Sequence, residues 1–141
     1  MTATNNYRFN AVTQTWEAWD SSLIMTPGRG YIATAATNGW FRGALHNGNY
    51  SYPVTFNSGG SSWNLIGNPY PSQLNLTDFL NANTNLNGTA YFMKTNVNVN
   101  VAVTDYTAIN GLTVTTDVPV SQGFFVEANA SGNAAFTNTM R

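Results

Sequence analysis

The chain contains no cysteine and very few charges. Of its 141 residues only 8% are charged, and five basic side chains oppose six acidic ones. The missing cysteines exclude disulfides, thiolate metal ligands and a thiol nucleophile, so apolar burial and hydrogen bonds must hold the fold together. The few Lys and Arg residues exclude the phosphate neutralisation on which nucleic-acid binding depends. We therefore expect no nucleic-acid partner.

Long apolar runs are missing as well. No stretch approaches the roughly 18 apolar residues that suggest a membrane-spanning helix, and no basic, hydrophobic leader follows Met1. We expect no membrane insertion, and we expect any export signal to lie outside this chain.

Neutral polar residues and aromatics take the place of charges. Asn, Thr, Ser and Gly favour turns and polar strand faces, while 43% of the residues are hydrophobic and 13% aromatic. Short β-branched and aromatic runs recur between Gly, Asn and Pro, which is typical of an all-β fold. We predict a jelly-roll-like β-sandwich. Its strands are expected at 7–9, 14–19, 30–36, 40–45, 52–56, 62–67, 89–94, 97–103, 112–116, 123–128 and 134–137.

Two segments have a periodicity of their own. Within 97–103 four valines alternate with Asn and Ala, which predicts a buried valine face. After two prolines, Leu76, Phe79 and Leu80 are spaced as on one face of a helix, and Asn75 or Thr77 can cap it. We predict one short helix near 76–82 that closes an end of the sandwich.

A short motif occurs twice in the chain. Gly30 leads into Tyr31-Ile32, and Gly123 leads into Phe124-Phe125; each pair precedes a small residue, a polar residue and Ala. A second Gly follows both copies at the same spacing. We therefore predict a single domain over residues 1–141. It is built from two half-repeats, about 7–56 and 62–141, that share a core.

Four segments carry a resemblance to a known family. They are Trp63–Pro71 (WNLIGNPYP), Asn87–Phe92 (NGTAYF), Gln122–Ala128 (QGFFVEA) and Phe136–Arg141 (FTNTMR). The chain resembles the β-rich module of large secreted and cell-surface proteins of the Bacteroidetes phylum, which often precedes a C-terminal type IX secretion sorting tail. The resemblance implies an extracellular or cell-surface location. It transfers no catalytic residues.

The residues offer little for catalysis or metal binding. The six carboxylates form no paired motif of the kind a glycosidase needs, and His46 is the sole histidine. We expect a non-catalytic module with no cofactor and no metal site. Calcium held by loop oxygens leaves no local signature, so that alternative stays open.

Aromatic side chains are the best candidates for binding. Sugars stack their C–H faces on Trp and Tyr and pair their hydroxyls with neutral amides, so the composition suits a neutral polysaccharide or cell-surface glycan. Core packing is the competing explanation, and we expect it for Tyr31, Trp63, Phe124 and Phe125. Trp16 and Trp19 have opposite strand parity, so one of them should point outward. The predicted ligand-binding set is Trp19, Trp40, Tyr50, Tyr52, Asn47 and Asn49.

A structural role is the alternative function. Upstream of Tyr7 the first half-repeat has no counterpart of the Trp63–Pro71 block. A strand from another copy of the chain would fill the resulting groove, which is a known route to assembly. The alternative is therefore a stalk or fibre subunit whose partners are copies of itself.

Overall fold

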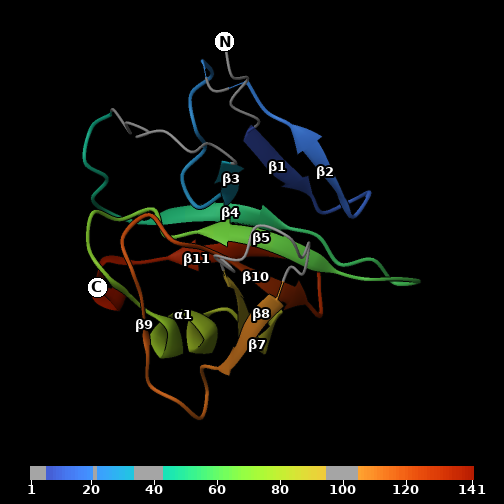
Figure 1. Ribbon diagram of the computed structural model, residues 1–141. Helices are drawn as coiled ribbons and strands as arrows, with labels where there is room; N and C mark the ends of the chain where they lie inside the picture. The colour runs from blue at the N-terminus through green and yellow to red at the C-terminus, as the bar shows by residue number, and fades with distance from the viewer. Residues whose placement is uncertain (1–5, 21, 34–42, 95–104) are drawn as a thin grey trace.

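The computed structural model describes residues 6–20, 22–33, 43–94 and 105–141 (Figure 1). The elements, in chain order, are β1 (Asn6–Asn10), β2 (Thr15–Ala18), β3 (Tyr31–Ala33), β4 (Tyr50–Val54), β5 (Trp63–Gly67), β6 (Leu74–Asn75), α1 (Leu76–Ala82), β7 (Leu86–Lys94), β8 (Asp105–Asn110), β9 (Asp117–Val118), β10 (Gly123–Ala128), β11 (Gly132–Phe136) and the 3₁₀ helix η1 (Asn138–Met140).

The strands form several antiparallel sheets. A four-stranded sheet has the order β5-β10-β7-β8, a three-stranded sheet has the order β2-β1-β3, and β4-β11 and β6-β9 are two-stranded pairs. In Figure 1 the three-stranded sheet lies at the top, and α1 lies at the opposite end of the molecule, beside β7 and β8. The prediction of an all-β, sandwich-like fold with one short helix is confirmed.

The helix begins and ends where the sequence predicts. Asn75 is its N-cap, and the Asn75 side chain accepts a hydrogen bond of 2.9 Å from the Asp78 N–H. Leu76, Phe79 and Leu80 are its buried residues. This apolar stripe packs on the core, which explains why so short a helix is stable.

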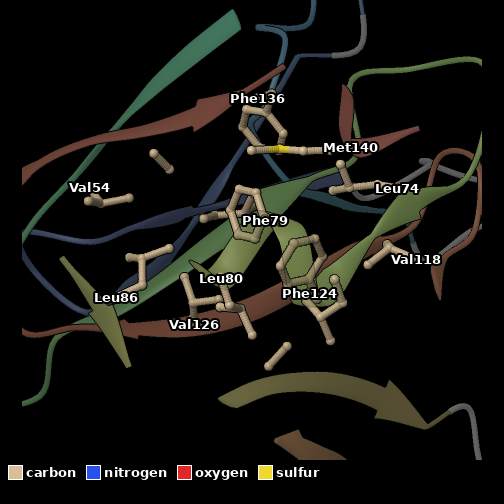
Figure 2. Close-up of a cluster of buried hydrophobic side chains, with 14 of the residues drawn as sticks. Val54, Leu74, Phe79, Leu80, Leu86, Val118, Phe124, Val126, Phe136 and Met140 are labelled. Atoms are coloured by element: carbon tan, nitrogen blue, oxygen red, sulfur yellow. The ribbon is translucent and has the colours of Figure 1, made fainter. Parts of the chain in front are cut away.

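The core is built around three phenylalanines from different elements (Figure 2). The Phe79 ring from α1 lies 4.9 Å from the Phe136 ring and 5.7 Å from the Phe124 ring, measured between centroids. Within the described part of the chain, every buried residue of this core cluster comes from position 54 or later. The first half-repeat adds Val54 and the half-buried Tyr50 and Tyr52, so its share of the core is small.

Strand β5 is the junction between the two copies of the glycine motif. On one side it pairs with β10, where Gly123 lies opposite Gly67. On its other side the Gly30 N–H donates to the Leu65 carbonyl (3.1 Å), and the Gly67 N–H donates to the Gly28 carbonyl (3.0 Å). A Cβ on Gly67 would lie 2.6 Å from the Arg29 carbonyl oxygen, so this close approach requires glycine.

Several strand predictions need correction. Residues 112–116 lie outside any strand, and a turn begins there because the Asn110 side chain accepts the Leu112 N–H (3.0 Å) and the Asn110 carbonyl accepts the Val114 N–H (3.0 Å). Residues 43–45 also lie outside any strand. The short strands β6 and β9 and the longer β8 were not predicted. The expectations for 34–36, 40–42 and 97–103 fall outside the described residues.

In the described ranges, no helix is long and apolar enough to cross a membrane.

Candidate functional site

An aromatic cleft of about 430 Å³ opens between the β1–β2 hairpin and the four-stranded sheet. Eight described side chains line it: Phe9, Gln14, Trp16, Ser61, Trp63, Tyr91, Tyr106 and Phe125. Six of the eight are aromatic, and none of the eight is charged. The lining is drawn from strands far apart in the sequence, so the fold must form before the cleft exists.

The floor of the cleft is the face of the four-stranded sheet that points away from α1. Successive residues of a strand point to opposite faces, so Phe124 and Val126 enter the core while Phe125 faces the cleft. Phe125 lies opposite Tyr91 of β7 in the strand register. Its ring centroid lies 5.8 Å from that of Tyr106 on β8. The sheet therefore brings aromatics of three adjacent strands together on one face.

The wall of the cleft is the hairpin formed by β1 and β2. Phe9 and Trp16 are directly opposite in the register and share a face. Their rings meet edge to face, with centroids 5.4 Å apart, and both contact the Phe125 ring, at 5.1 Å for Phe9 and 5.8 Å for Trp16. Trp16 remains 41% exposed although it contacts two rings. A large apolar surface is thus open to solvent at the mouth of the cleft.

Gln14 joins the wall to the floor. Its Nε2 donates to the Trp63 carbonyl (3.0 Å), and its Oε1 accepts from the Trp63 N–H (3.1 Å). The same Nε2 also donates to the Ala11 carbonyl (2.7 Å), and Asn57 Nδ2 donates to that carbonyl as well (2.9 Å). The hairpin turn is therefore held to the edge of β5 by side-chain amides.

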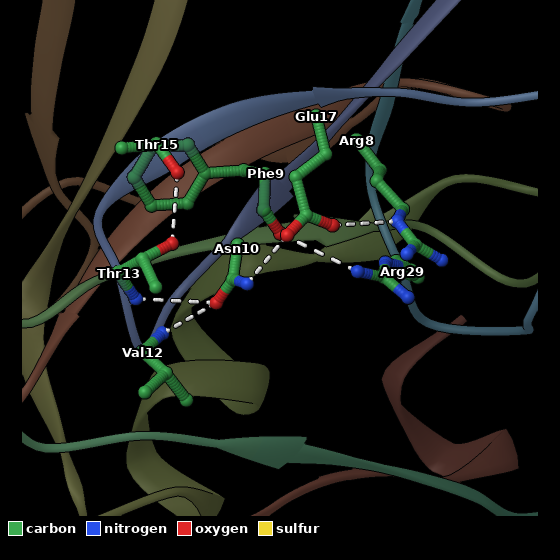
Figure 3. Close-up of polar contacts among 8 residues, drawn as sticks. All are labelled: Arg8, Phe9, Asn10, Val12, Thr13, Thr15, Glu17 and Arg29. Carbon is green, nitrogen blue, oxygen red and sulfur yellow. Dashed lines mark hydrogen bonds and ion pairs between the residues drawn. The ribbon is translucent and has the colours of Figure 1, made fainter.

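The hairpin also carries a polar network (Figure 3). Arg8 Nε donates to Glu17 Oε2 (3.0 Å), and Asn10 Nδ2 donates to Glu17 Oε1 (2.6 Å). These hydrogen bonds, the one from Asn10 first, hold the pKa of Glu17 below its usual value. Arg29 Nη2 reaches the Phe9 carbonyl at 3.4 Å. The network orders both hairpin strands behind the aromatic wall.

The donors of the cleft are uncharged: they are hydroxyls, the indole N–H groups of Trp16 and Trp63, and the amide of Gln14. Ser61, Tyr91 and Tyr106 contribute the hydroxyls, and burial raises the pKa of the Tyr106 hydroxyl above its usual value. Across the described residues, no group of three His, Cys, Asp or Glu side chains could hold a metal ion. The chemistry that this arrangement offers is stacking and neutral hydrogen bonding.

The predicted binding residues that the structure describes, namely Trp19, Asn47, Asn49, Tyr50 and Tyr52, are not among the residues that line the cleft. Trp19 is half-buried against the Tyr31 ring, at 4.6 Å between centroids. Tyr50 contacts the His46 and Tyr70 rings, at 5.1 and 6.0 Å. Trp40 falls outside the described residues.

Tyr50 and Tyr52 do share a face of β4, as the alternation predicts. That face packs against the core, whereas Ser51 and Pro53 are exposed, so the two tyrosines form no platform open to solvent. Burial raises the pKa of Tyr52, in keeping with this position.

The two predicted asparagines are exposed. Asn47 Oδ1 accepts from the Gly48 N–H (3.0 Å) and from Arg141 Nη2 (3.1 Å). Part of its hydrogen-bonding capacity is therefore used within the chain. Asn49 lies beside it in sequence, one residue before β4.

The sequence reasoning missed the aromatics that line the cleft. It assigned Trp63 to the core, but the parity of β5 places Asn64 and Ile66 on the core side and Trp63 on the cleft. Of the two tryptophans on the hairpin, Trp16 is the more exposed. The parity of β10 was a usable signal, since Phe124 and Phe125 cannot both enter one core.

A model of the family described as "Domain of unknown function (DUF8693)" matches residues 1–141. No curated protein and no solved structure gave a significant match to the chain. The geometry of the cleft is therefore what supports a functional proposal.

Proposed function

The chain belongs to DUF8693, a family of unknown function, and we propose that it is a non-catalytic module that binds a neutral glycan. The parent protein would be secreted or displayed on a cell surface, which fits the resemblance of the Trp63–Pro71 and Gln122–Ala128 segments to Bacteroidetes modules of the type IX secretion pathway.

The observation that carries this proposal is the aromatic cleft. Aromatic rings offer a sugar flat apolar faces, and the tyrosine and serine hydroxyls offer uncharged partners for its oxygens. A volume of about 430 Å³ lies within the roughly 300–1,000 Å³ of small-molecule sites. The lack of charge among the described lining residues favours a neutral ligand over an anionic one, because no cation is placed to pair with it.

The test is glycan binding by matched variants. The chain is screened against neutral polysaccharides and cell-surface oligosaccharides, and the best ligand is titrated by calorimetry. Trp16→Ala should weaken binding at least about tenfold, since truncating a central aromatic contact typically costs about 2 kcal/mol. Phe56→Ala is the control, because Phe56 is 42% exposed, nearly the same as Trp16, and lies outside the cleft lining.

Two results would overturn the proposal. One is equal affinity in Trp16→Ala and in the native chain. The other is no binding to any neutral glycan, together with multimers that resist dilution in light scattering. The second result would favour the stalk or fibre subunit, in which copies of the chain complete one another.

A further inference from the structure

We infer that Gln14 is the positioning residue of the cleft. Its side-chain amide makes the hydrogen bonds to the Trp63 backbone that a neighbouring strand would otherwise make, and these bonds hold the β1–β2 hairpin against the four-stranded sheet. The binding part of the test rests on the proposed glycan function. The docking part needs no ligand.

The backbone of Gln14 is the first observation. Gln14 has φ +55°, one of two positive-φ residues other than glycine in the described chain. This left-handed conformation costs free energy in a residue with a Cβ, and a glycine would adopt it readily. The turn itself is held by Asn10, whose Oδ1 accepts the N–H groups of Val12 (2.9 Å) and Thr13 (3.2 Å). A residue other than glycine in this left-handed conformation points to a role for its side chain.

The hydrogen bonds of Gln14 are the second observation. One amide group bonds both the N–H and the C=O of Trp63, which is the two-point pattern of a strand ladder. Trp63 lies opposite Glu127 of β10 on its other side. Further along the same edge of β5, Gly28 and Gly30 make the equivalent bonds to Gly67 and Leu65. Gln14 thus completes an edge that the chain's backbone leaves open at the cleft.

The weak burial of the hairpin is the third observation. Every residue of β1 and β2 is half-buried or exposed, so no core side chain anchors these strands. Phe9 and Trp16 reach the Phe125 ring only while the hairpin stays docked. Among the described residues, the side-chain amides of Gln14 and Asn57 join its turn to β5 and to the segment that leads into β5. The width of the cleft therefore depends on the Gln14 amide.

Gln14→Gly is the decisive variant, because glycine relieves the left-handed backbone while it removes the side chain that carries the amide. We expect a folded chain in which the Trp63 N–H exchanges with solvent about fivefold faster or more, as for the loss of one hydrogen bond of about 1 kcal/mol. Glycan affinity should fall by a similar factor or more. Thr13→Ala is the control, since the exposed Thr13 hydroxyl bonds the Thr15 hydroxyl at the start of β2 and lies outside the cleft lining.

Gln14→Glu tests the same bonds with the side-chain length kept. It retains an oxygen for the Trp63 N–H but loses the donor, and its charge faces the carbonyls of Ala11 and Trp63. We expect weakened glycan binding at neutral pH here too.

The outcomes separate the two proposals. Unchanged exchange of the Trp63 N–H in Gln14→Gly would overturn the inference. Faster exchange of the Trp63 N–H with unchanged glycan affinity would show that Gln14 holds the hairpin but does not position the cleft for binding, and this would also overturn the inference. Faster exchange in a chain that binds no neutral glycan would support the docking role of Gln14 and sink the proposed function instead.

Discussion

The region around α1 and the β1–β2 hairpin are stabilised by different means. Around α1, side chains such as Phe79, Phe124 and Phe136 are almost fully removed from solvent. In the hairpin nothing is fully buried, and the strands are held by ring edges, side-chain amides and an exposed ion pair. Burial of apolar surface dominates folding free energy, whereas exposed polar contacts add little each. The candidate site therefore lies where local opening is least costly, and the core can stay intact when the site changes.

Phe79→Ala should cause the largest loss of stability. Phe79 has no exposed surface and packs on two other rings, so truncation leaves a cavity that should lower the free energy of unfolding by about 3–5 kcal/mol. Urea titration followed by circular dichroism measures this. Phe56→Ala, which removes a 42% exposed ring, should lower the free energy of unfolding far less. An equally large loss of stability in Phe56→Ala would contradict the contrast between core and surface.

Asn83→Ala should rank second. Asn83 is 2% exposed; its Nδ2 donates to the Phe79 carbonyl (2.8 Å) and to the Ala135 carbonyl (2.9 Å), and its Oδ1 accepts the Ala135 N–H (2.6 Å). Alanine leaves these backbone groups buried without partners, at a cost of roughly 1–3 kcal/mol. Asn133→Ala, on the exposed part of β11, is the matched control in the same titration. Equal losses of unfolding free energy in Asn83→Ala and Asn133→Ala would mean that the hydrogen bonds of the buried Asn83 amide do not stabilise the fold.

Trp16→Ala should lower stability less than Phe79→Ala does. It removes edge contacts to Phe9 and Phe125 from a side chain that is already 41% exposed, and each such pair contributes about 0.5–1.5 kcal/mol. The same urea titration checks this, beside the glycan titration described above. A loss as large as that of Phe79→Ala would place Trp16 in the core rather than at a binding surface.

Glu17→Gln should have the smallest effect, visible as a change in pH dependence. The pKa of Glu17 is lowered from 4.5 by the hydrogen bonds from Asn10 and Arg8, so the folded state binds this proton less readily than the unfolded state. The carboxylate therefore stabilises the fold above pH 4.5, and this contribution is lost as the pH falls through the lowered pKa. The variant should show a flatter fall in melting temperature on acidification.

Asp20 must be accounted for in that measurement. Its pKa is lowered too, by the backbone N–H of Ser22, and it remains in Glu17→Gln. Asp20→Asn therefore serves as the companion variant. An acid-induced fall of unchanged size in Glu17→Gln would show that the network in Figure 3 does not stabilise the hairpin.

Local signals predicted part of the fold. The helix over Leu76–Ala82 and the strand Gly123–Ala128 follow from periodicity and from flanking caps and turns, all of which lie within a few residues. The strand prediction for 112–116 was wrong. The β-branched residues of this segment suggest a strand, but the Asn110 side chain caps a turn there. Strands β6 and β9 have two residues each and form by pairing with each other across a long stretch of sequence, so no local pattern predicts them.

The candidate site was harder to predict than the fold. Aromatics and neutral polar groups, the residue types expected at a glycan site, do line a cleft. Which aromatics gather was not predictable, because Trp16, Trp63 and Tyr106 meet only through the packing of a hairpin on a sheet. Nor does local sequence reveal that Gln14 bonds Trp63, 49 residues away.

The close approach at Gly67 has a consequence for how such chains can diverge. Any side chain at this position would collide with the Arg29 carbonyl, whatever the chain binds. Exposed residues of the cleft such as Trp16 face no such steric demand, because part of the side chain borders open space. Related chains that keep this junction must keep glycine at position 67, whereas the exposed aromatic residues of the cleft can be substituted. Homologous chains should thus remain recognisable by the glycine at this junction even where they bind different ligands.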